Sequence, residues 1–168
     1  MRWIPLLLIL TLATLSGLIV LPRIEDNSKR QLLFISLLYL AGLGTILFTP
    51  VSFDGASVYI MPAGVGRVNL HRLYLHGAGF IENIILTIPL GFLLKKLVPQ
   101  LPLLVIGILG VAVGGGIEVL QYYMSNAWLI NRSSDINDVI ANALGIVIGG
   151  VVMMIYQTFI NDKIKRNL

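Results

Sequence analysis

Five long apolar runs set the fold class of this 168-residue chain. A helix crosses the hydrocarbon core of a bilayer with about 20 predominantly apolar residues. Hydrophobic residues make up 57% of the chain and charged residues only 12%, which excludes an ordinary soluble enzyme. We therefore expect an all-α, polytopic membrane helix bundle that forms one integral-membrane domain over residues 1–168. The expected transmembrane helices cover residues 4–21, 31–48, 79–94, 101–124 and 136–160.

The cysteine, histidine and charge content limits which cofactors, metals and binding partners this chain can have. The absence of cysteine excludes a disulfide framework, a thiolate metal site and a Cys nucleophile, and His71 and His76 alone are too few for a zinc site built from histidines. The net charge is +4, but the Lys and Arg residues stand at segment ends without a basic stripe. We expect the lipid bilayer as a partner, and no nucleic acid, metal or cofactor. The oligomeric state stays open.

The basic residues also predict the topology, because Lys and Arg are enriched in cytoplasmic loops. Five spans put the termini on opposite sides of the membrane. One side carries Arg2, Arg67, Arg72 and Arg132, and the other carries Arg23, Lys29, Arg30, Lys95, Lys96, Lys163, Lys165 and Arg166. We expect the second side to be cytoplasmic, with the N-terminus and the long 49–78 loop outside. The first run ends without a small-x-small cleavage site, so we expect it to be a retained helix.

Most acidic residues lie on the expected outer side, opposite to the side with most of the basic residues. Five acidic residues fall on the expected outer side, and they include every acid within or beside a span: Asp54, Glu82, Glu118, Asp135 and Asp138. Carboxylates at membrane depth are costly unless they are paired or face water, so they mark a candidate site. A structural alternative is that Glu82 and Asp138 stabilise helix N-termini through the helix dipole.

Two spans place polar residues on the same face as a glycine ridge. In the fourth span Gly110, Gly114, Glu118 and Gln121 follow at steps of three and four residues, and in the fifth span Asp138, Asn142, Gly145 and Gly149 do the same. Small residues at such spacing let helices approach closely in lipid. We expect these two helices to pack together and to bring their polar residues to one place at the depth of the outer leaflet. Pro89 and Gly91 are expected to kink and pack the third span, where Glu82 shares a face with Pro89.

Arg132 lies between the last two spans and has two expected roles. It can hold a phosphate or carboxylate with a bidentate guanidinium, or it can form a structural ion pair with Asp135 or Asp138, which the chemistry favours. The whole candidate site comprises Glu82, Asn83, Glu118, Gln121, Arg132, Asp135, Asp138 and Asn142. This set suits a polar headgroup, a cation or general acid–base hydrolysis. Motifs for a nucleophile or a phosphate loop are missing, so enzymatic activity and catalytic residues stay open.

Three motifs in the second half of the chain resemble the VanZ-like membrane protein family. They are Glu82-Asn83 with Ile-Pro-Leu-Gly-Phe at 88–92, Ile-Glu-Val-Leu-Gln at 117–121, and Arg132 with the run 135–145. The resemblance implies a protein of the bacterial cytoplasmic membrane and cell envelope. The name-giving member is associated with low-level resistance to the glycopeptide teicoplanin. The 49–78 loop differs from the family pattern, since His71-Arg72 follows Asn69-Leu70 where relatives often carry Pro-Phe.

These observations support three hypotheses. In the first, the polar cluster binds a lipid-linked or lipidated glycopeptide-type ligand at the outer leaflet, such as a lipid-linked cell-wall precursor or a lipoglycopeptide, and contributes to low-level glycopeptide resistance. An alternative is a membrane-embedded hydrolase that acts on a lipid-linked headgroup with a carboxylate pair. A second alternative is a small transporter with Glu118 as the carrier, against which the missing inverted repeat argues.

Overall fold

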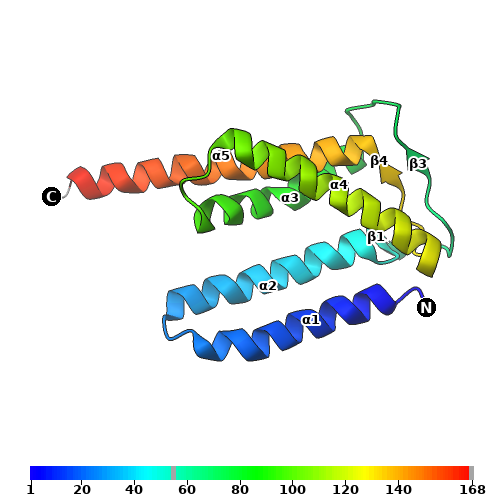
Figure 1. Ribbon diagram of the computed structural model, residues 1–168, viewed down its shortest axis with the longest axis horizontal. Helices are drawn as coiled ribbons and strands as arrows, with labels where there is room; N and C mark the ends of the chain where they lie inside the picture. The colour runs from blue at the N-terminus through cyan, green and yellow to red at the C-terminus, as the bar shows by residue number, and fades with distance from the viewer. Residues whose placement is uncertain (54–55, 167–168) are drawn as a thin grey trace. The chain divides into compact units, whose positions relative to one another are not determined.

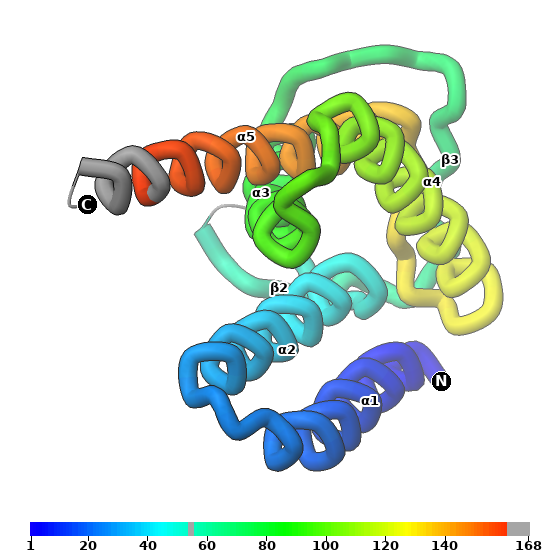
Figure 2. Tube along the Cα trace, turned by 60° about the vertical axis from the view of Figure 1, so that its left-hand side comes forward, coloured from blue at the N-terminus to red at the C-terminus, as the bar shows by residue number. Residues whose placement is uncertain are grey.

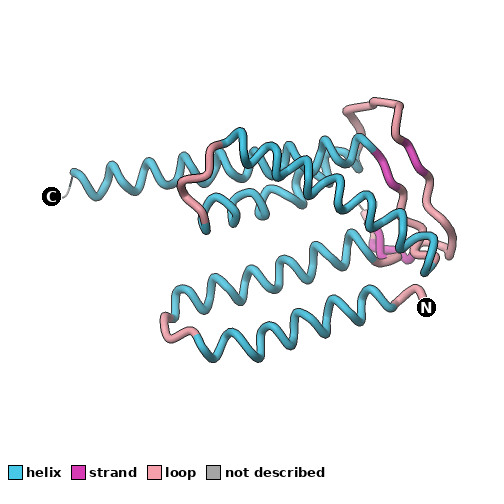
Figure 3. The backbone as a smooth tube through the Cα atoms, viewed as in Figure 1, coloured by secondary structure: helices cyan, strands magenta, loops and turns pink. Residues whose placement is uncertain are grey.

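The computed structural model describes the backbone of residues 1–53 and 56–166, with side chains up to residue 160. Asp54, one of the acids expected on the outer side, lies outside the described residues. Helices dominate the described chain, and the strands are short and confined to the connections before α3 and α5 (Figure 3). The elements are α1 Ile4–Val20, the 3₁₀ helix η1 Leu21–Arg23, α2 Asn27–Phe48, β1 Val51–Phe53, β2 Val58–Ile60, β3 Val68–Asn69, α3 Ala78–Leu97, α4 Leu103–Trp128, β4 Ser134–Asp135 and α5 Ile136–Arg166.

The described residues contain five helices that are long and apolar enough to cross a membrane, which confirms the expected helical fold class. Several helices extend beyond the apolar runs. For example, α2 begins at Asn27 rather than at residue 31 because Asp26 caps it, accepting hydrogen bonds from the amides of Ser28 at 2.8 Å and Lys29 at 3.2 Å. Because this cap binds the free amides of the first turn, the polar residues 27–30 are helical together with the apolar run that follows.

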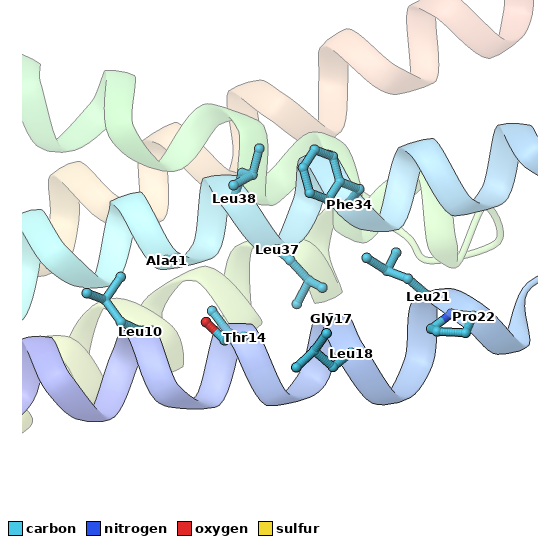
Figure 4. A pocket seen from close by; sticks show the side chains of 11 residues that line it. Leu10, Thr14, Gly17, Leu18, Leu21, Pro22, Phe34, Leu37, Leu38 and Ala41 are labelled. Carbon is cyan, nitrogen blue, oxygen red and sulfur yellow. The ribbon is translucent and has the colours of Figure 1, made fainter.

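The chain divides into two compact units. The first unit comprises Met1–Val68 and Val119–Ser134, and the second comprises Asn69–Glu118 and Asp135–Leu168. In the first unit α1 and α2 run side by side as a helical hairpin through η1 (Figures 1 and 2). An apolar groove of about 470 Å³ lies between them, and Leu10, Thr14, Leu37 and Ala41 are among its lining residues (Figure 4).

In the second unit α5 packs against α3, and the two helices run parallel. Thr87 of α3 is fully buried, and its hydroxyl donates to the carbonyl of Asn142 at 3.1 Å. Glycines make this approach close: a Cβ at Gly145 would overlap the carbonyl of Ile84, and one at Gly149 would overlap the carbonyl of Ile88. The α5 glycine ridge therefore faces α3.

The second unit also contains the first part of α4, which packs against α5 in the opposite direction. A Cβ at Gly110 would lie 3.1 Å from the Cα of Ala143, and one at Gly114 would lie 2.8 Å from the carbonyl oxygen of Val139. The expected packing of these two helices is confirmed. Gly110 and Gly114 approach α5 at Val139, Asn142 and Ala143, rather than at Gly145 and Gly149.

Two glycines of this unit offer a matched test of the close packing. A Cβ at Gly149 would meet backbone atoms of Ile88 and Phe92, which cannot move aside, whereas a Cβ at Gly116 would meet nothing within 4 Å. We expect Gly149→Ala to destabilise the protein by about 1–3 kcal/mol, in the range of overpacked cores. Gly116→Ala should leave stability unchanged or raise it slightly, because alanine favours helix. Thermal unfolding in one detergent measures both, and equal unfolding temperatures would contradict this packing.

Candidate polar site

The second unit brings Asn83, Asp138 and Asn142 together across the α3–α5 contact. Asp138 lies in the first turn of α5, and its side chain hydrogen bonds with the side chain of Asn83 on α3. One turn further along α5, the Asn142 side chain is 1% exposed, and neither its Nδ2 nor its Oδ1 has a hydrogen-bond partner. An unsatisfied buried polar group costs about 1–3 kcal/mol. The cluster therefore holds a buried amide that can both donate and accept.

Glu118 belongs to the same unit and approaches the cluster from α4. Its side chain is buried, and Oε2 accepts a hydrogen bond from the backbone amide of Asp135 at 2.8 Å. The carboxyl group lies close enough to Asp135 and Asp138 for their charges to act on it. Three expected site carboxylates thus meet where α5 begins. The contact to the Asp135 amide gives Glu118 a part in fixing that helix start.

Asp135 is the N-terminal cap of α5. Its Oδ1 accepts from the backbone amide of Asn137 at 2.9 Å and from the side-chain amide of Asn69 at 2.9 Å, and the hydroxyl of Tyr74 donates to Oδ2. Burial alone would raise the pKa of Asp135, but the hydrogen bonds from Tyr74, Asn137 and Asn69 outweigh burial and lower it. The same hydrogen bond raises the pKa of Tyr74. Both carboxylate oxygens of Asp135 thus accept hydrogen bonds from groups of the protein itself.

The end of the 49–78 loop is fastened to the start of α5. The Asn137 side chain accepts from the amide of Tyr74 at 2.8 Å and donates to the carbonyl of Arg72 at 2.8 Å. Asn69 in turn donates to the Arg72 carbonyl at 2.9 Å. The His71-Arg72 sequence that departs from the family pattern therefore lies inside a hydrogen-bonded turn, whose anchor is the buried pair Asp135 and Asn137.

Arg132 and Gln121 lie in the first unit and serve the end of α2. The Arg132 guanidinium donates to the carbonyl oxygens of Thr49 at 3.0 Å, Ile46 and Val51, and Gln121 donates to the carbonyl of Leu47 at 2.9 Å. The last carbonyls of a helix have no partner within the helix, so these side chains cap α2. Burial lowers the pKa of Arg132. Within the first unit, the Nε and one terminal nitrogen of the Arg132 guanidinium are thus bonded to carbonyl groups.

The remaining expected residues are placed as follows. Glu82 is partly exposed on α3 beside Asn83, Gly91 meets the backbone of Ile146 on α5, and Pro89 is exposed. In the described part of the chain, no group of three or more His, Asp or Glu side chains could hold a metal ion.

Sequence reasoning missed Asn69, Tyr74, Thr87, Ser125 and Asn137. Ser125 is buried, donates to the carbonyl of Arg132 and accepts from its amide, so it fixes the turn that carries the guanidinium. Asn137 could have been found, since an Asp-x-Asn sequence before an apolar run is a helix-start signal. No pattern in the sequence pairs Asn69 or Tyr74 with a carboxylate more than 60 residues away.

The fold and this cluster define a class: a polytopic helical membrane protein with a carboxylate and amide site at the start of its last helix. The family model VanZ/LLP1 matches residues 8–157, so the chain belongs to the VanZ/LLP1 family. Neither the curated proteins nor the solved structures give a match to this chain.

The lowered pKa of Asp135 predicts a pH-dependent stability. The stability that this carboxylate adds is fully present above the ordinary carboxyl pKa of about 4 and is lost as pH falls through the lower folded value. We expect Asp135→Asn to lower the unfolding temperature at pH 7, and the gap to wild type to narrow below about pH 4. Tyr74→Phe, which removes one of the hydrogen bonds, should have a smaller effect. A gap that does not change with pH would show that Asp135 acts without its charge.

Proposed function

We propose that this protein lies in the bacterial cytoplasmic membrane as part of the cell envelope, with its N-terminus outside and its C-terminus in the cytoplasm. The excess of Lys and Arg on one set of connections supports this orientation. The cluster at the start of α5 then lies at the depth of the outer leaflet, where lipid-linked envelope molecules expose their headgroups.

We further propose that the cluster binds a lipid-linked or lipidated glycopeptide-type ligand and thereby contributes to low-level teicoplanin resistance. The observation that carries this proposal is the Asn142 amide, which is buried without a hydrogen-bond partner beside the Asn83–Asp138 pair. A polar group of the ligand would take the place of Asn83 as the hydrogen-bond partner of Asp138. The same ligand would then reach the Asn142 amide, which lies one helical turn further along α5. Peptide and sugar groups carry both donors and acceptors, as that amide requires.

The proposal assigns the ligand contacts to a subset of the candidate residues. Asn83, Asp138 and Asn142 contact the ligand, and Glu82 lies at the rim. Glu118 and Asp135 hold the start of α5, while Gln121 and Arg132 cap α2. This division predicts two classes of variant. Variants of the first group lose binding and keep the fold, whereas variants of the second group lose the fold.

Antibiotic susceptibility in a sensitive host tests the proposal. We expect wild type to raise the teicoplanin concentration needed for inhibition several-fold, with a smaller effect on vancomycin. Asp138→Asn and Asn142→Leu should abolish protection at unchanged membrane abundance. The matched control is Asn126→Ala, because Asn126 is exposed on α4 and bonds only to Tyr122 of its own helix.

Two results would contradict this function. One is full protection by both cluster variants, which would remove the cluster from the mechanism. The other is a lack of protection by abundant wild-type protein, which would show that teicoplanin resistance does not extend to this chain. In that case, lipids that copurify with the protein would be the ligands to identify.

A further inference from the structure

The β1–β2 hairpin has one apolar face. The two strands pair antiparallel, with Val51 opposite Ile60, Ser52 opposite Tyr59 and Phe53 opposite Val58. Residues opposite each other point to the same face, and successive residues alternate. One face therefore carries Val51, Phe53, Val58 and Ile60, and the other carries Ser52 and Tyr59.

Three of the four side chains on this apolar face are exposed in the described part of the chain, and Val51 is partly buried. Phe53 is 51% exposed, Val58 71% and Ile60 61%. Exposed apolar patches of this kind mark sites of contact with protein or membrane. Unlike the apolar faces of the five helices, this patch belongs to a connection outside the candidate spans. Its exposure is therefore not explained by a transmembrane position.

The covalent attachment of the hairpin indicates what covers the face. The transmembrane helix α2 ends at Phe48, and β1 begins at Val51 and contacts α2 (Figure 1). Two linking residues span at most about 10 Å, since an extended residue covers about 3.3–3.6 Å. The hairpin base is also fixed, because the Pro50 carbonyl accepts from the Met61 amide at 2.8 Å and Arg132 donates to the Val51 carbonyl. The apolar face is thus held at the edge of the hydrocarbon core.

We propose that the apolar face of the β1–β2 hairpin inserts into the interfacial region of the lipid bilayer. A two-stranded sheet has open edges, which are not tolerated within the hydrocarbon core, so the hairpin lies at the interface and does not span. The Ser52 and Tyr59 face points to the headgroups and water, and Tyr59 suits this depth because aromatic residues with a polar tip are enriched there. The hairpin thus tethers the 49–78 loop to the lipid surface.

Site-directed spin labelling tests this insertion, and the chain is suited to it because it contains no cysteine. Single variants Phe53→Cys and Val58→Cys label the apolar face, and Ser52→Cys and Tyr59→Cys are the matched controls on the other face. The full-length protein is reconstituted into vesicles of phosphatidylethanolamine and phosphatidylglycerol. Relaxation of each nitroxide is measured with oxygen, which concentrates in lipid, and with a water-soluble nickel chelate.

We expect labels at 53 and 58 to respond several-fold more to oxygen than to nickel, and labels at 52 and 59 to show the reverse. Equal access of nickel to all four labels would overturn the proposal, since the hairpin would then stand in water. Protection of the 53 and 58 labels from both reagents would also overturn it, since protein would then cover the face. Circular dichroism and a single peak in size-exclusion chromatography verify the fold of each variant.

Discussion

Backbone contact between α5 and its two neighbouring helices is the interaction on which the second unit depends. Lipid offers no hydrophobic gain for helix association, so close van der Waals packing and interhelical hydrogen bonds must hold the helices together. Gly145 and Gly149 admit α3, and Gly110 and Gly114 of α4 admit α5. The Thr87 hydroxyl adds a hydrogen bond to the Asn142 carbonyl within this contact. The arrangement fixes which polar side chains meet at the start of α5.

The expected site residues of the two units divide by their hydrogen bonding. Asp135 accepts hydrogen bonds as a helix cap and loop anchor, and in the other unit Arg132 donates to carbonyls at the end of α2. Asn142 differs, because its buried amide has no partner. A buried polar group that lowers stability without serving the fold is typical of a functional site. The proposed ligand contact gives a physical reason to keep an asparagine at this position.

The sequence predicted the five helices and the packing of α4 on α5, because apolar run length and glycine spacing depend only on local order. It did not predict which neighbour each glycine ridge faces, since both faces of α5 carry small residues. The hydrogen bonds of Arg132 to the end of α2 were not predicted either: charge complementarity pointed to a carboxylate, whereas the open carbonyls of α2 are acceptors that the sequence does not display. The contacts of Asn69 and Tyr74 depend on a loop path that no periodicity encodes.

Thermal unfolding of wild type and Asn142→Leu in lipid nanodiscs, with and without teicoplanin, tests the central claim most directly. If Asn142 is kept for a ligand, the leucine variant should be more stable without ligand, because it removes an unsatisfied buried amide. Teicoplanin should then stabilise wild type alone, since a ligand raises stability only where it binds the folded state. A leucine variant that is less stable than wild type, together with equal ligand shifts in both proteins, would contradict the account and make Asn142 a structural residue.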